Sequence, residues 1–200
     1  DDFSDGGSRN TWLLRNTGEG RFEDVTEASG ILTRRDDDDP TGRPGEVWAF
    51  GDVDNDGDLD VYTGCPTAVV NCGSQTSEIM LNNGDGTFSL GPDDADLRSG
   101  GSPGGAAFVD VDRDGALDLW VTEYSAAQDR LYRGDGAGGF TDITDEAGLQ
   151  TVAWSSVATL NEASAHSNAW SALACDLNND GDPELLAASY GRAPNHLWQS

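Results

Sequence analysis

The chain has 200 residues, of which 37 are acidic and 11 basic, so its formal net charge is −26. This charge argues against nucleic acid as a partner, because phosphate backbones require clustered lysine and arginine. No apolar run approaches the roughly 20 residues of a membrane span, so no membrane insertion is expected. Hydrophobic residues still make up 36% of the chain. We therefore expect a folded chain whose negative charge is offset by bound cations.

Two elements alternate along the sequence. The first is an acidic string between short apolar segments, and its copies begin at Asp52, Asp110 and Asp176. The second is an apolar pair followed by Arg or Asn, a Gly-rich turn and Phe, as in LLRNTGEGRF from Leu13 and LYRGDGAGGF from Leu131. Such recurrence predicts a repeat protein, in which each unit buries its faces against its neighbours.

Four short strands are predicted in each unit, which is the size of one β-propeller blade at about 50–70 residues. We expect an all-β fold of about three units of antiparallel strands. The strands are predicted at 47–50, 59–63, 79–82 and 87–90, at 106–109, 117–122, 130–133 and 139–143, and at 171–175, 184–189 and 196–198.

A single repeat domain is predicted over residues 1–200. Its units lie at about 46–104 and 105–168, with partial units at about 1–45 and 169–200. Residues 24–31 and 142–149 each resemble a short helical turn that ends at a glycine. Because the chain starts at Asp1 without Met, we expect a mature product or a piece of something longer.

The spacing inside each acidic string is that of a cation-binding loop. Hard cations such as Ca²⁺ take six to eight oxygen ligands, whereas Mg²⁺ prefers octahedral geometry with retained waters. Acids at positions 1, 3 and 5 turn toward one centre, Gly at position 6 permits a sharp turn, and an acid at position 9 closes the shell. About three Ca²⁺ ions are predicted, with ligands Asp52, Asp54, Asp56, Asp58 and Asp60 in the first loop, Asp110, Asp112, Asp114, Ala116 and Asp118 in the second, and Asp176, Asn178, Asp180, Asp182 and Glu184 in the third.

Position 7 is expected to offer only its main-chain carbonyl, because Ala116 has no side-chain ligand there. Asp58 and Asp182 are therefore carbonyl ligands in this interpretation. The third site is predicted to be the weakest, since Asn178 replaces a carboxylate and Glu184 is longer than Asp. Asp-Gly pairs also favour turns without a metal, but three copies in register favour ions.

The cysteines and an RGD triplet are interpreted as structural features. Cys65 and Cys72 bracket a short loop, and a disulfide between them is expected if the protein is secreted. Cys175 is expected to be a small buried core residue. The Arg133-Gly134-Asp135 triplet is interpreted as a variant of the repeat turn rather than a receptor motif.

These motifs resemble FG-GAP/VCBS-type repeats of integrin α-subunit propellers, and most of all the ASPIC/UnbV-associated, cartilage-acidic-protein-like branch. The resemblance rests on VWAFGDVDNDGDLDVY, AAFVDVDRDGALDLWV and LYRGDGAGGFTDITDEAGL. It implies a calcium-stabilised β-propeller that is extracellular, at a cell surface or periplasmic, and often serves adhesion. The FG pair itself remains only at Phe50-Gly51. Because propellers have four to eight blades, three units predict a segment of a larger propeller or a self-associating unit.

The preferred function is a non-enzymatic, calcium-binding module for protein–protein interaction or adhesion, with an unidentified protein or glycan ligand. One alternative is a carbohydrate-binding module that uses Trp154, Trp170 or Trp198. The other is a hydrolase or lyase on a propeller scaffold, with His166 and a partner such as Glu162.

Overall fold

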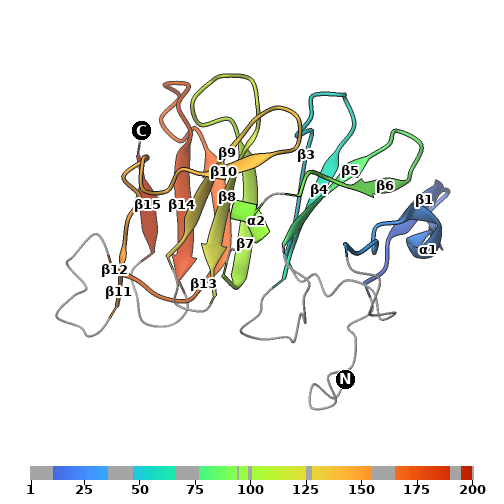
Figure 1. Cartoon of the computed structure of the whole chain (residues 1–200), viewed down its shortest axis with the longest axis horizontal. Helices are drawn as coiled ribbons and strands as arrows, with labels where there is room; N and C mark the ends of the chain where they lie inside the picture. Colours follow the sequence, from blue (N-terminus) through green and yellow to red (C-terminus); the bar gives the residue numbers. More distant parts are fainter. Residues whose placement is uncertain are drawn as a thin grey trace, which may run out of the picture.

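The computed structural model describes residues 11–35, 47–65, 77–93, 95–98, 101–124, 128–154, 165–189 and 195–199. It confirms the all-β prediction, with twisted sheets standing side by side (Figure 1). Each predicted strand coincides with an observed strand, although some ends differ by one to three residues. Among the described residues, no helix is long and apolar enough to cross a membrane.

Three antiparallel sheets correspond to the three units, and we call them sheets 1, 2 and 3 in chain order. Sheets 1 and 2 have four strands, whereas three strands of sheet 3 are described. Sheet 1 contains β3 (Val47–Gly51), β4 (Asp60–Gly64), β5 (Glu78–Asn82) and β6 (Phe88–Leu90). Sheet 2 contains β7 (Pro103–Val109), β8 (Asp118–Glu123), β9 (Arg130–Gly134) and β10 (Phe140–Asp142), and sheet 3 contains β13 (Ala169–Cys175), β14 (Glu184–Ser189) and β15 (His196–Trp198).

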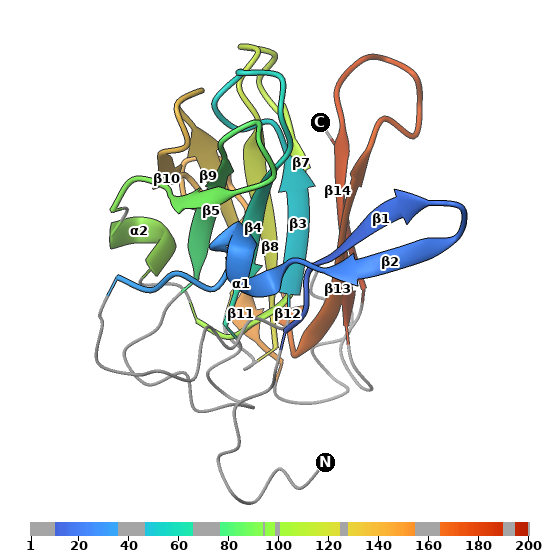
Figure 2. The same ribbon diagram turned by 90° about the vertical axis from the view of Figure 1, so that its right-hand side faces the viewer.

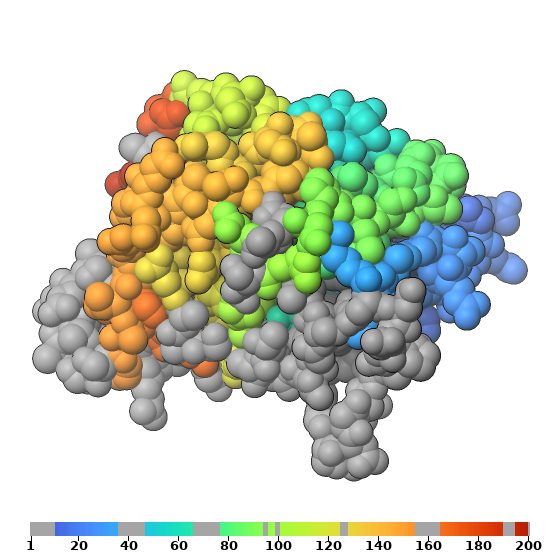
Figure 3. Space-filling model, in the orientation of Figure 1, coloured from blue at the N-terminus to red at the C-terminus, as the bar shows by residue number. Residues whose placement is uncertain are grey.

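The remaining elements are short. A hairpin of β1 (Leu14–Gly18) and β2 (Arg21–Asp24) leads into helix α1 (Thr26–Ser29), and α2 spans Ala95–Arg98. A parallel pair, β11 (Val152–Ala153) and β12 (Ala165–His166), precedes sheet 3. Figure 3 shows β5–β6 (green) meeting the β9–β10 region (gold) on one face of the molecule.

The sheets are held together because each central strand is apolar on both faces. In β8, Leu119 and Val121 face the core shared with sheet 1, whereas Trp120 faces the core shared with sheet 3. All three side chains are at most 2% exposed. Alternate residues of one strand point to opposite faces, so sheet 2 is buried between its two neighbours.

The segment from Leu13 to Ile31 repeats the outer half of sheet 2. The Leu13 N–H donates to Thr26 Oγ1 at 2.8 Å, and the Leu131 N–H donates to Thr144 Oγ1 at 3.0 Å. The two predicted helical turns are confirmed, and both end at a glycine with positive φ, 70° at Gly30 and 72° at Gly148. Ile31 then packs on the outer face of sheet 1.

The expectation that Cys175 is a buried core residue is wrong, because its thiol is free and exposed. Along β13, Ala172 and Ala174 pack against sheet 2, so Leu173 and Cys175 point to the opposite face. The equivalent residues of sheet 2, Ala107 and Val109 on β7, pack in the core shared with sheet 3. The burial of such a side chain therefore depends on a following sheet, and the described residues place none beyond sheet 3.

Candidate metal centres

All three acidic loops lie at the same end of their sheets (Figure 2). Each connects the first strand of its sheet to the second: β3 to β4, β7 to β8, and β13 to β14. This common position follows from the shared topology of the three sheets.

The loops turn sharply at positions 4 and 6, and the turn at position 6 was predicted from its glycine. The fourth position has a left-handed backbone in every loop, with φ of 59° at Asn55, 62° at Arg113 and 61° at Asn179. The glycine at position 6 also has positive φ, for example 96° at Gly57. Asn tolerates this region and Gly adopts it freely, whereas Arg is uncommon there.

Backbone N–H groups hold the first carboxylate in place. Asp52 accepts hydrogen bonds from the N–H groups of Asp56 and Gly57, each at 3.0 Å. Asp176 accepts from Asp180 and Gly181 in the same way, at 3.2 and 2.9 Å. These bonds orient the carboxylate without requiring another side chain.

The closing acid is the most buried member of each loop, since Asp60, Asp118 and Glu184 are all 0% exposed. Asp118 accepts from the N–H of Val111 at 2.8 Å and from that of Gly134 at 3.0 Å. It therefore joins the start of its own loop to β9. Burial raises the pKa of Asp60 and Asp118, although these backbone bonds and the equivalent ones at Asp60 oppose the shift. An ionised closing acid thus requires a compensating positive charge.

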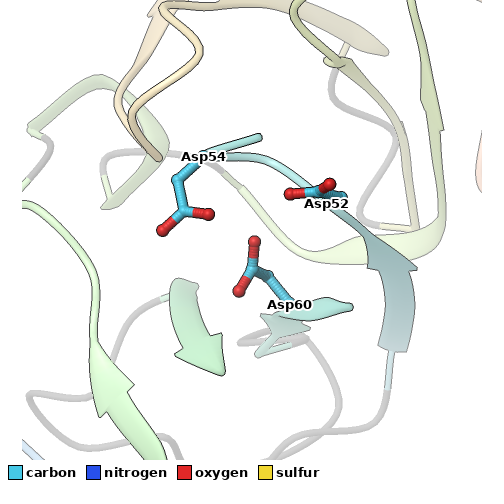
Figure 4. A group of neighbouring side chains, drawn as sticks. All are labelled: Asp52, Asp54 and Asp60. Carbon is cyan, nitrogen blue, oxygen red and sulfur yellow. The ribbon is translucent and has the colours of Figure 1, made fainter. Parts of the chain in front are cut away.

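Carboxylates converge in the first two loops. Oxygens of Asp52, Asp54 and Asp60 lie within 4.8 Å of one another, and Figure 4 shows the three groups pointing toward one centre. The second loop gathers Asp110, Asp112 and Asp118 in the same way. Asp54 Oδ1 and Asp110 Oδ1 are buried and have no hydrogen-bond partner, which is the chemistry that a bound cation would satisfy.

Other predicted ligands lie outside these convergent groups. Asp56 Oδ1 accepts from the Asp58 N–H at 2.9 Å, and Asp114 Oδ1 accepts from the Ala116 N–H at 2.8 Å. Each position-5 carboxylate therefore supports the turn that places position 7. Asp176, Asp180 and Glu184 of the third loop, all of them described, do not form such a group.

Two arginines lie against the acidic loops, and neither contact was predicted from the sequence. Arg133 Nε is 3.2 Å from Asp112 Oδ2, so the first residue of the RGD triplet forms an internal ion pair. Asp135, the third, accepts from the N–H groups of Ala137 and Gly139. The triplet lies at the end of β9 and the start of the turn to β10, which is where its interpretation as a repeat turn placed it. Arg113 reaches from the second loop to the third, where it ion-pairs with Asp182.

The candidates for other functions are spread over the molecule. His166 is buried, with Nδ1 2.8 Å from Thr151 Oγ1, and Glu162 lies outside the described residues. Trp198 packs edge-on against Trp120 at 5.2 Å, whereas Trp170 is 52% exposed and stacks on Tyr124 at 4.4 Å.

Only one of the two cysteines in the predicted Cys65–Cys72 disulfide is described. Cys65 is disulfide-bonded, and Cys72 lies outside the described residues.

A second pair of buried acids, Glu123 and Asp129, lies where β8 leads toward β9. The Glu123 N–H donates to Asp129 Oδ1 at 2.8 Å. Burial, and to a smaller degree the charge of Glu123, raises the pKa of Asp129 to about 7. Because the folded pKa is raised, the stability contributed by this group is present below the ordinary Asp value and is lost as pH rises through about 7.

We expect Asp129→Asn to stabilise the protein at pH 8 by on the order of 2–4 kcal/mol and to have little effect near pH 4. The Asn oxygen can still accept from the Glu123 N–H, so the packing is kept. Urea denaturation of both proteins between pH 4 and 8 measures the difference. A difference that stays constant over this range would contradict the assignment.

The fold and the loops define a class of protein: a repeat of antiparallel sheets, each with an acidic turn at the same end, two of which gather carboxylates that could hold a cation. Residues 67–121 match the FG-GAP-like repeat, which covers the end of the first unit and the second acidic loop. This segment therefore carries an FG-GAP-like repeat, as the motifs of the chain indicated. A search of curated proteins found no match.

Proposed function

We propose that this chain is part of a β-propeller-type interaction module whose first two acidic loops bind structural Ca²⁺. The observation that carries the proposal is the convergence of three carboxylates in each of the first two loops, around a fully buried closing acid. The unpartnered buried oxygens of Asp54 and Asp110 support it. An ion at each centre would offset the repulsion and fix the turn between two strands.

The proposed module acts by presenting surfaces, without catalysis, to a protein or glycan partner outside the cytoplasm, at a cell surface or in the periplasm. This part rests on the FG-GAP-like repeat at residues 67–121. The environment of His166, buried and bonded to Thr151, favours a packing role over that of a general base.

The outer face of sheet 3 supports assembly with a further blade. Leu173 is 58% exposed and Leu197 is 50% exposed. Leu197 occupies the position that Leu131 has in sheet 2 and Ile79 in sheet 1, and both of those are buried. We propose that another blade, from a longer chain or from a second copy, covers this face as sheet 3 covers sheet 2.

The calcium proposal predicts that metal removal lowers the melting temperature strongly. At a free Ca²⁺ concentration about 1,000-fold above Kd, each occupied site adds about 4 kcal/mol of stability. Each kcal/mol corresponds to about 2–4 °C in a domain of this size. We therefore expect Tm to fall by about 10 °C or more when a chelator replaces Ca²⁺, and to recover only in part with Mg²⁺. Equal melting curves with and without the chelator would refute the proposal.

A further inference from the structure

The third acidic loop differs from the other two in the groups that surround its carboxylates. Asn178 stands at position 3, where the first two loops have Asp54 and Asp112. Arg113, from the second loop, lies on its backbone. Asn178 brings an N–H donor to a position at which the other loops present an acid, and Arg113 brings N–H donors from the neighbouring loop.

The amide of Asn178 is oriented by the backbone. Its Oδ1 accepts from the Asp180 N–H at 2.9 Å, a donor that is shared with Asp176 Oδ1 at 3.2 Å, and the opposite orientation would set the NH₂ group against this N–H. Its Nδ2 then donates to Asp180 Oδ2 at 2.8 Å and to Glu184 Oε1 at 3.1 Å. These oxygens belong to the predicted ligands at positions 5 and 9. The amide nitrogen thus bridges carboxylates that a cation would otherwise bridge.

Arg113 supplies the positive charge. Its Nε donates to the carbonyl of Gly181 at 3.0 Å and its Nη2 to that of Asp180 at 3.2 Å. Nη2 also lies 2.6 Å from Asp182 Oδ1. The planar guanidinium therefore contacts positions 5, 6 and 7 of the third loop at once, which is the kind of forked recognition that Arg provides and Lys does not.

The guanidinium fits closely against the turn. A Cβ on Gly181 would lie 2.8 Å from Arg113 Nη2, so a larger residue there would displace the guanidinium. Arg113 also holds a left-handed backbone, with φ of 62°, at a position where the other two loops have Asn. Arg is less suited than Asn to this conformation, and its contact with sheet 3 offsets that disadvantage.

We propose that the third loop is held by the Asn178 amide and the Arg113 guanidinium in place of a divalent ion. The three acidic loops, all within the described residues, then bind two Ca²⁺ ions, and a side-chain contact between sheets 2 and 3 takes the place of the third. This inference rests on the proposed calcium binding of the first two loops. It replaces the sequence-based expectation of about three ions with two ions in the three loops.

The test counts Ca²⁺ ions per chain by equilibrium dialysis and calorimetry on the whole 200-residue protein. We expect two ions for the wild type and one for each of Asp54→Asn and Asp112→Asn. The double variant Arg113→Asn/Asn178→Asp gives the second loop the Asn that the first has at position 4, and gives the third loop the Asp that the first has at position 3. It should gain a third ion. Asn178→Asp alone serves as a second route to the same gain, with far-UV circular dichroism to check folding.

The outcomes separate the inference from the function on which it rests. Three ions in the wild type, with one lost in Asp180→Asn, would overturn the inference and leave calcium binding intact. No ions in the wild type would overturn both. Two ions in the wild type and still two in the folded double variant would overturn the claim that these residues exclude the ion. A third check is Arg113→Asn, which should lower Tm by the same amount with Ca²⁺ and with a chelator.

Discussion

Asp118→Asn is expected to lower the free energy of unfolding by about 3–5 kcal/mol in saturating calcium. Asn has nearly the same shape as Asp, so the loss comes from chemistry rather than volume. Both Asp118 oxygens accept backbone N–H groups, from Val111 and Gly134. An amide has one oxygen, so its NH₂ group must face one of these donors. The proposed ion loses a charged ligand at the same time.

The two parts of this loss are separated by comparison with Asp112→Asn. Asp112 is exposed and belongs to the same convergent group, but its link to β9 is a surface ion pair with Arg133 and not a pair of backbone hydrogen bonds. We expect its effect to fall to about 0.5 kcal/mol or less in a chelator, the size of an exposed ion pair, whereas Asp118→Asn should still cost about 1–3 kcal/mol there. Urea denaturation with Ca²⁺ and with a chelator measures both.

The matched control is Asp58→Ala, which installs the residue that the second loop has at position 7. Its effect should stay within about 0.5 kcal/mol, because the proposed ligand there is the carbonyl. If Asp58→Ala and Asp118→Asn were equally damaging, the ranking of these acids by burial and bonding would be wrong.

The strands and loop turns could be predicted from sequence because their causes are local. The left-handed φ of 96° at Gly57 follows from a glycine at the sixth position of the loop. Comparison of the three loops supplied information that a single loop lacks. Ala116 in the second loop showed that position 7 needs no side-chain ligand. The antiparallel pairing of consecutive strands follows from the short connections between them.

The contacts between units could not be predicted in this way. The hydrogen bonds from Arg113 join residues 67 and 68 positions apart, and nothing near Arg113 in the sequence distinguishes it from a solvated side chain. Cys175 was misjudged for a related reason. Its apolar neighbours indicate a strand, but only the packing of the sheets decides which face of that strand is covered.

Trp120→Ala is expected to cost about 3–5 kcal/mol of unfolding free energy, the usual loss when a buried aromatic side chain is removed. Trp120 is 0% exposed and belongs to the core between sheets 2 and 3. Its ring meets Trp198 edge-on at 5.2 Å, and its Nε1–H donates to the Leu186 carbonyl at 2.9 Å. The substitution therefore opens a cavity and removes a bond between neighbouring sheets.

Trp120→Phe should cost less, about 1–3 kcal/mol, because a ring remains and the hydrogen bond is lost. Trp170→Ala is the matched control, since this side chain is 52% exposed and its loss should cost about 1 kcal/mol or less. Denaturation followed by far-UV circular dichroism ranks the three, and amide hydrogen exchange should show that Trp120→Ala weakens protection in β13 and β14 before β3 and β4. A uniform loss of protection would mean that the sheets unfold as one unit. The contacts between sheets 2 and 3 would then not stabilise those two sheets independently of sheet 1.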